Sequence, residues 1–139
     1  MFKNILVPTD LSEKSIKALD IAAKIGSENE CKITLLHVIE TIEDTDYEEF
    51  EEFYGKLKNR AQKKMEEMAN RCGDKNIIIQ RRVVFGKRVR EIVRFAHENA
   101  IDLIILSSHK IDKIDAAEGW ATISYRVGIL SHCPVLMVK

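Results

Sequence analysis

The stretch Ile33-Thr34-Leu35-Leu36-His37-Val38-Ile39 is rich in β-branched and large apolar residues. A run of this kind and length suits a strand that is covered on both faces, as the strands of a parallel sheet are. Four further runs read as strands, although polar residues interrupt the second: Ile5-Leu6-Val7, Ile77–Val84, Asp102–Leu106 and Pro134–Val138. The sequence therefore predicts five strands.

The segments between these runs carry apolar residues every three or four positions, which is the spacing of an amphipathic helix. The first of them is predicted to begin at Ser12 as a hydroxyl N-cap and to stop at Gly26. The others cover about 47–72, the positions from Val89 to Ala96, and 121–130. Strands that alternate with helices pair in parallel through right-handed crossovers. We therefore expect a three-layer, Rossmann-like α/β domain over residues 1–139, with a five-stranded parallel sheet and helices on both faces.

Composition excludes several classes of protein. The 139 residues include 22 Lys and Arg and 22 Asp and Glu, so the formal net charge is zero, which disfavours a nucleic-acid binder. No apolar run approaches the roughly 20 residues that cross a bilayer, and the start of the chain leads directly into a strand rather than a secretory signal. Three cysteines without metal-ligand spacing indicate reduced thiols. We expect a cytoplasmic protein.

Ligands of an open parallel sheet bind beyond the carboxyl ends of its strands, where the strand order reverses. This rule selects Pro8, Thr9 and Asp10 after the first strand and Val38 in the second. It also selects the end of the fourth strand and the residues directly after it: Leu106, Ser107, Ser108, His109 and Lys110. The fourth helix is expected to begin near Ala121 and Thr122, where free N–H groups attract an anion such as phosphate.

The same residues resemble the universal stress protein family. Ile5-Leu6-Val7-Pro8-Thr9-Asp10 with Ser12 is similar to its first strand, and Leu35-Leu36-His37-Val38 to its second. Asp102–His109 stands where that family has Asp-Leu-Ile-Val-Met-Gly-Thr-His, and Cys133–Val138 is similar to its closing strand. The resemblance extends in order over the whole chain and implies the adenine nucleotide alpha-hydrolase-like fold.

One branch of this family binds ATP through Gly-x-x-Gly followed by Gly-Ser or Gly-Thr, and another branch does not bind it. The three glycine positions fall on Ser107, Lys110 and Ala121, so all are replaced. Glycine serves where the backbone takes positive φ or approaches a phosphate closely, although the Lys110 ammonium is itself suited to phosphate. The resemblance therefore implies a degenerate site. ATP or AMP with Mg²⁺ is the candidate ligand, and no obligatory cofactor is expected.

If a nucleotide binds, the resemblance implies that Thr9 and Asp10 lie at the ribose and adenine, with Val38 against the base. Ser108, His109, Lys110, Thr122 and Ile123 would line the triphosphate. Two interpretations of Asp10 stay open, because this side chain also suits a turn-organising role in the first strand–helix connection.

The histidines and cysteines do not predict a metal site. His37 lies in an apolar run and is interpreted as a packed, hydrogen-bonded residue, and His97 as solvent-exposed. His109 has the best position for function but no Ser or Cys partner for a triad. No catalytic residue is assigned.

Three surface features keep more than one interpretation. The basic residues Arg81, Arg82, Lys87, Arg88, Arg90 and Arg94 form either a solvated face, which we favour, or a patch for phosphate or an acidic partner. Phe50 and Phe53, beside the acidic stretch 40–52, are expected to pack in the core, with an exposed recognition surface as the alternative. Three interpretations of Trp120, just before the fourth helix, stay open: it fills part of the phosphate pocket, stacks on a base or partner, or covers the edge of the sheet.

These observations favour a regulatory or interaction protein with an unidentified protein partner; the alternative is an ATP- or AMP-binding switch. A hydrolase is the weakest hypothesis, because the sequence has neither a Walker lysine motif nor a second acid beside Asp10 for Mg²⁺. Family dimers pair their final strands, which implies a homodimer through Val135, Leu136, Met137 and Val138. An apolar strand at a sheet edge also needs a partner to avoid aggregation.

Overall fold

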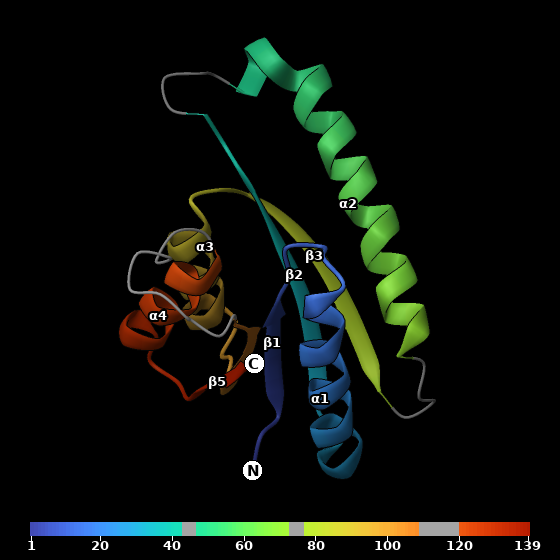
Figure 1. Cartoon of the computed structure of the whole chain (residues 1–139), viewed down its shortest axis with the longest axis vertical. Helices are drawn as coiled ribbons and strands as arrows, with labels where there is room; N and C mark the ends of the chain where they lie inside the picture. Colours follow the sequence, from blue (N-terminus) through green and yellow to red (C-terminus); the bar gives the residue numbers. More distant parts are fainter. Residues whose placement is uncertain (43–46, 73–76, 109–119) are drawn as a thin grey trace.

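The computed structural model describes residues 1–42, 47–72, 77–108 and 120–139, and a parallel sheet lies at its centre (Figure 1). The strands are β1 (Asn4–Pro8), β2 (Lys32–Glu40), β3 (Ile78–Gly86), β4 (Leu103–Ser107) and β5 (Val135–Val138). Their order across the sheet is β3-β2-β1-β4-β5, and every neighbouring pair is parallel. The predicted five-stranded parallel sheet is confirmed.

Helices cover both faces of this sheet. They are α1 (Lys14–Asn29), α2 (Glu51–Arg71), α3 (Arg88–Glu98) and α4 (Trp120–Leu130), and a single 3₁₀ turn, η1 (Tyr47–Phe50), precedes α2. Figure 1 shows α1 and α2 on one side of the sheet and α3 and α4 on the other. Of the helices described, none is both long enough and apolar enough to cross a membrane.

Alternation along the strands divides the apolar side chains between two cores. Ile5 and Val7 of β1 pack with α1 and α2, whereas Leu6 between them packs with α3 and α4. The same alternation separates Leu35 from Leu36 in β2. Successive side chains of a strand point to opposite faces, so each central strand needs apolar residues at successive positions and not only at alternate ones. This requirement explains why the strands are visible in the sequence.

The first helix corrects two predictions. It begins at Lys14 without a side-chain cap, because the Ser12 hydroxyl donates instead to Asp10 Oδ1 at 2.6 Å. It also continues past Gly26 to Asn29 and ends where Glu30 adopts the left-handed conformation. Gly26 is a packing glycine rather than a helix stop, since a Cβ there would lie 3.1 Å from Ile33 Cδ1.

The predicted third strand over Ile77–Val84 is confirmed, although the polar residues Gln80, Arg81 and Arg82 interrupt its apolar run. β3 runs through all three, and they are exposed. β3 lies at the edge of the sheet, so its polar side chains reach water without breaking the ladder with β2.

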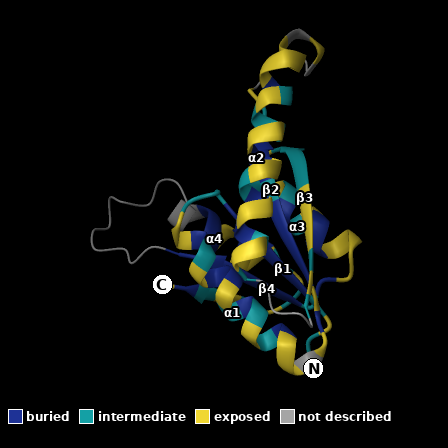
Figure 2. Ribbon diagram, turned by 90° about the vertical axis from the view of Figure 1, so that its right-hand side faces the viewer, coloured by how far each residue is buried: buried dark blue, intermediate teal, exposed yellow. Residues whose placement is uncertain are grey.

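The aromatic residues at the start of α2 are the largest departure from expectation. Phe50 is 37% and Phe53 is 50% exposed, so the prediction that they pack in the core is wrong. Tyr54, only 1% exposed, takes the buried position instead. Figure 2 shows the physical reason: this end of α2 extends beyond the sheet, so no core lies beneath most of its surface.

The end of β3 provides a test of backbone strain. Gly86 has φ +148°, and a Cβ there would lie 2.8 Å from Glu91 Cγ. We expect Gly86→Ala to lower the free energy of unfolding by about 1–3 kcal/mol, because alanine rarely adopts this conformation. Urea unfolding followed by circular dichroism measures the change.

Gly55 provides the matched control, because it lies in α2 with no atom within 4 Å of an added Cβ. Gly55→Ala should raise the free energy of unfolding by up to about 1 kcal/mol through helix propensity. Equal effects of the two substitutions would contradict the assignment of strain to Gly86.

Candidate functional site

The sheet order reverses at β1, which lies between β2 and β4, and the first candidate residues meet beside this point. They form an enclosed crevice at the carboxyl ends of β1 and β2, with these lining residues: Pro8, Thr9, Asp10, Leu36, His37, Val38, Arg88 and Ile92. Its volume is about 10 Å³. A cavity of that size holds about one water molecule, so a nucleobase enters only if side chains move.

Thr9 holds the connection between β1 and α1 in place. Its N–H donates to Leu36 O at 2.8 Å, which extends the pairing of β1 with β2 by one residue. Its hydroxyl donates to Ser15 Oγ at 2.7 Å and accepts the Leu11 N–H at 3.0 Å. Thr9 is 2% exposed, so water cannot reach its hydroxyl, and these bonds supply the partners that a buried hydroxyl needs.

Asp10 organises the turn between β1 and α1. Its Oδ1 accepts the Ser12 N–H at 2.9 Å and the Ser12 hydroxyl at 2.6 Å, and Ser15 Oγ lies 3.3 Å away. Between Asp10 and Ser12, Leu11 has a positive φ of 69°, which turns the chain back toward the carboxylate. The turn-organising interpretation of Asp10 is confirmed, and its side chain also lines the crevice.

These contacts set the protonation state of Asp10. Burial raises the pKa of the carboxyl group, but the hydrogen bonds from Ser12 and Ser15 together outweigh burial and hold the pKa below its ordinary value. Asp10 is therefore ionised at neutral pH, and it is an acceptor for hydroxyl or N–H groups rather than a proton donor.

His37 forms the opposite wall of the crevice. Its Nδ1 lies 2.9 Å from Thr9 O, and because a carbonyl only accepts, Nδ1 carries the proton. Burial lowers the pKa of His37, and the Arg88 charge lowers it further. The ring is thus neutral, with Nε2 as an acceptor. The expected hydrogen-bonded role is confirmed, but sequence reasoning did not include His37 among the site residues.

Sequence reasoning also does not identify Arg88 as a site residue, because the sequence places it among the basic residues of a solvated face. It is the first residue of α3, and it closes the crevice together with Ile92 one turn later. The predicted topology alone could identify Arg88 as a candidate site residue. Every helix that comes after a strand begins at the carboxyl edge of the sheet, so the first residue of each helix is a candidate site residue.

Ser107 and Ser108 lie in a different hollow. It measures about 410 Å³ and is lined by residues of α1 and by the last strands: Glu13, Lys14, Lys17, Ser107, Ser108, Val138 and Lys139. Ser108 N–H donates to Val138 O at 2.7 Å, and Ser107 O accepts the Ser124 hydroxyl of α4 at 3.2 Å. The two serines are thus placed between β5 and the start of α4.

The other predicted site residues are distributed unevenly. Leu106 is fully buried and Ile123 is 8% exposed, and both pack in the core beneath α3 and α4. Ala121 and Thr122 occupy the first turn of α4, as expected for its start. His109 and Lys110 lie outside the described residues. The structure therefore brings Pro8, Thr9, Asp10 and Val38 together, apart from Ser107 and Ser108 at the end of β4.

Metal and thiol chemistry have little support in the described part of the chain. It contains no group of three or more His, Cys, Asp and Glu side chains suited to a metal ion. All three cysteines are free, and burial raises the pKa of each thiol, that of Cys72 to about 12. Since the thiolate is the nucleophile, none of them is activated at neutral pH.

Comparison with known proteins identifies the architecture. The model of the universal stress protein family matches residues 1–139. The chain belongs to this family. It is 29% identical to universal stress protein YxiE of Bacillus subtilis over the full length of both chains. It is 31% identical to universal stress protein MJ0577 of Methanocaldococcus jannaschii, with 100% of this chain and 96% of that protein covered.

Solved structures agree with this assignment. The structure of protein MJ0577 superposes with a TM-score of 0.84 at 34% identity, covering 100% of this chain and 96% of the other. A universal stress protein in complex with cAMP superposes with a TM-score of 0.70 at 22% identity, covering 99% and 97% of the two chains. At that identity the second likeness concerns the fold alone. The three-layer, Rossmann-like fold is confirmed.

The hydrogen bonds of Asp10 predict a pH dependence. Asp10→Ala should lower the free energy of unfolding by about 1–2 kcal/mol at pH 7, because two serines lose their charged acceptor. The native pKa lies below the unfolded value near 3.9, so the stabilisation is present above that value and is lost as pH falls through the native pKa. Urea unfolding at several pH values between 7 and 3 measures it.

Glu28→Ala, which removes an exposed carboxylate near the end of α1, serves as the control and should have little effect at any pH. A difference between Asp10→Ala and the unsubstituted protein that stays constant down to the lowest pH would contradict the role of the ionised carboxylate.

Proposed function

We propose that this chain is a regulatory protein of the universal stress protein family that works as a homodimer and binds adenine nucleotides weakly. The observation that carries the proposal is the crevice of about 10 Å³ between Asp10, His37 and Arg88. It lies where an open parallel sheet binds ligands, yet it has room for about one water molecule. A nucleotide therefore binds only with rearrangement, which reduces its affinity.

The ligand class is supported by chemistry and by relatives. The crevice offers an ionised carboxylate and a neutral imidazole acceptor, which suit a ribose hydroxyl and a base, while the Arg88 side chain takes up space beside them. Two fold relatives were solved in complex with cAMP and with dAMP, which supports an adenine nucleotide. Replacement of the three glycines at Ser107, Lys110 and Ala121 supports weak binding of the phosphates.

A second candidate function is an ATP- or AMP-dependent switch, and the hollow beside Ser107 and Ser108 favours it. Its lysines Lys14, Lys17 and Lys139 supply positive charge near the start of the connection to α4. A nucleotide changes the protein's surface only if it binds one arrangement of that connection better than another. Micromolar affinity would favour this function over the first.

Association through β5 is supported by a comparison of the two edge strands. β3 carries exposed Arg81 and Arg82, which discourage strand addition, whereas β5 has the sequence Val-Leu-Met-Val and Leu136 is 40% exposed. Pro134 O and Val138 O accept bonds from β4 and the residue after it. By alternation, the backbone groups of Val135 and Met137 face the open edge, where a second copy can pair with them.

Nucleotide titration tests the first part of the proposal. Calorimetry with AMP and with ATP·Mg²⁺ should give a Kd weaker than about 100 µM for the unsubstituted protein. Lys110→Gly with Ala121→Gly should tighten ATP binding about tenfold if the side chains at the former glycine positions keep the phosphates from the backbone. Arg88→Ala should tighten AMP binding, because it enlarges the crevice.

The controls separate the causes. Asp10→Ala in the Arg88→Ala background should weaken AMP binding again, since the carboxylate is a proposed ligand to the ribose. A Kd in the low micromolar range for the unsubstituted protein would contradict the weak site. An absence of heat with every variant would show that no adenine nucleotide binds here.

Light scattering after size-exclusion chromatography tests the dimer. The unsubstituted protein should have twice the mass of the 15.9 kDa chain at micromolar concentration. Val135→Pro should shift it toward monomer, because proline removes an outward N–H donor while the bonds to β4 remain. Ile78→Ser, at 70% exposed Ile78 on the opposite edge, should leave the mass unchanged. A monomeric unsubstituted protein would contradict the dimer.

A further inference from the structure

The protein carries an exposed aromatic surface at the junction of β2 and α2. We define the aromatic tip as Ile42, Phe50 and Phe53, which are 56%, 37% and 50% exposed. Large apolar side chains that gather on a surface away from the core mark sites of interaction more often than isolated ones do. The nucleotide crevice involves none of these residues.

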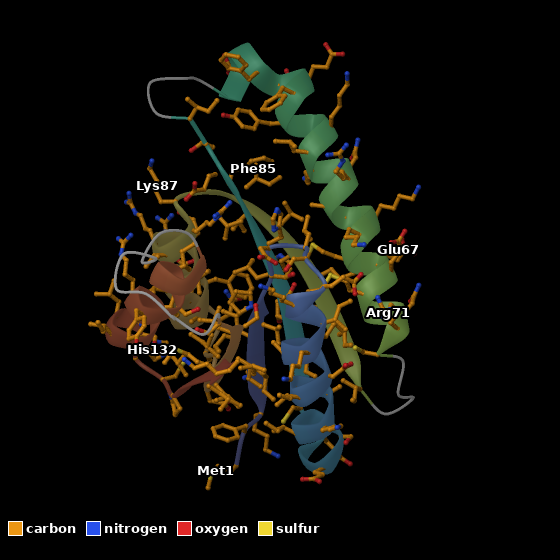
Figure 3. The ribbon with its side chains drawn as sticks, in the orientation of Figure 1. Met1, Glu67, Arg71, Phe85, Lys87 and His132 are labelled. Atoms are coloured by element: carbon orange, nitrogen blue, oxygen red, sulfur yellow. The ribbon has the colours of Figure 1, made fainter. Side chains whose placement is uncertain are left out.

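The aromatic tip is held by contacts beneath it. The ring of buried Tyr54 lies 5.5 Å from that of Phe53 and 6.4 Å from that of Phe50, in tilted and edge-on arrangements. Phe85 of β3 meets Tyr54 from the other side at 6.0 Å, and Figure 3 shows Phe85 pointing toward α2. The Tyr54 hydroxyl accepts the Ile42 N–H at 3.1 Å. The exposed rings are therefore positioned before any partner arrives.

Acidic residues surround the aromatic tip. We define the acidic rim as Glu40, Glu48, Glu51 and Glu52, all four of which are exposed. Glu51 and Glu52 lie in the first turn of α2, where the helix dipole favours negative charge, but Glu40 belongs to β2 and gains nothing from that dipole. An apolar centre with a charged rim is the usual composition of a protein–protein interface.

The aromatic tip lies away from the edge proposed for dimerisation. β2 and β3, which support it, are on one side of β1, and β5 is the strand at the opposite edge. Figures 1 and 2 show the start of α2 projecting beyond the sheet, remote from β5 and α4. A partner bound at this surface leaves β5 free, and each copy in a dimer would present one such surface.

We propose that the aromatic tip and acidic rim together bind an amphipathic segment of another protein, with apolar side chains on one face and Lys or Arg beside them. Charge complementarity selects this occupant. Apolar side chains of the segment would cover Phe50 and Phe53, and its cations would face the acidic rim, which steers the encounter and rejects acidic segments.

The probe is a labelled synthetic helix of about 18 residues composed of Leu and Lys, followed by fluorescence anisotropy. A second helix with Glu in place of Lys tests the charge. We expect the Leu/Lys helix to bind with a Kd below about 50 µM, to bind more weakly at high salt, and to exceed the Leu/Glu helix at least tenfold. No binding of the Leu/Lys helix, or equal binding of both, would overturn the proposal.

Substitutions locate the binding. Phe50→Ser with Phe53→Ser should raise the Kd at least tenfold, whereas Ile129→Ser, at a residue of α4 that is 78% exposed, should leave it unchanged. Glu40→Lys with Glu52→Lys keeps the rings, neutralises the net charge of the rim and should abolish the preference for the Leu/Lys helix over the Leu/Glu helix. This variant alters exposed side chains only, so it tests the proposal even if the serine variant unfolds.

Two further outcomes count against the proposal. Equal Kd values for the unsubstituted protein and for both tip variants would show non-specific attraction to the probe. Growth of the mass beyond a dimer with concentration, abolished by Phe50→Ser with Phe53→Ser, would assign the surface to a second copy of this chain instead.

Discussion

Burial of the central sheet on both faces is the constraint on which the rest of the structure depends. β1 contributes Ile5 and Val7 to the core under α1 and α2, and Leu6 to the core under α3 and α4, all three fully buried. Each fully buried side chain of this size contributes roughly 1.5–3 kcal/mol. A polar residue inside a central strand therefore needs a hydrogen-bond partner within the protein, as His37 has in Thr9 O, and most of the candidate binding groups lie at the strand ends.

The same constraint explains where the candidate site lies and why it is small. Parallel strands require crossovers, so α1 and α3 both begin at the carboxyl edge of the sheet and bring Ser12, Ser15 and Arg88 to it. The serines satisfy Asp10, and Arg88 closes the crevice opposite. What a nucleotide would need from Asp10 is already used to hold the turn, so a ligand must compete with bonds inside the protein.

The fold was predictable from the sequence because its signals are local. β-branched apolar runs and helical spacing need no knowledge of neighbours, and they located every strand and helix to within a few residues. The errors concern properties that depend on distant contacts. Gly26 resembles a helix stop until Ile33 is seen packed against it, and only the place of β3 at the edge of the sheet explains why Arg81 and Arg82 can lie within a strand. Within the site, the sequence identifies Asp10 because this residue comes directly after a strand. It does not identify His37, which lies in an apolar run typical of the core, or Arg88, which lies in a basic run typical of a solvated surface.

Phe50 and Phe53 show the limit of periodicity in another way. Spacing of three and four groups them with the apolar residues of α2, but it does not show how far the sheet extends beneath that helix. Because α2 is longer than the surface it covers, its apolar stripe continues past the core, and only Tyr54 finds full burial there. The contrast with the crevice is physical: the polar groups of the crevice form hydrogen bonds within the protein, whereas the apolar side chains of the aromatic tip remain exposed to water. Binding of a partner is therefore more favourable at the aromatic tip than at the crevice, because it removes apolar area from water without breaking a hydrogen bond inside the protein.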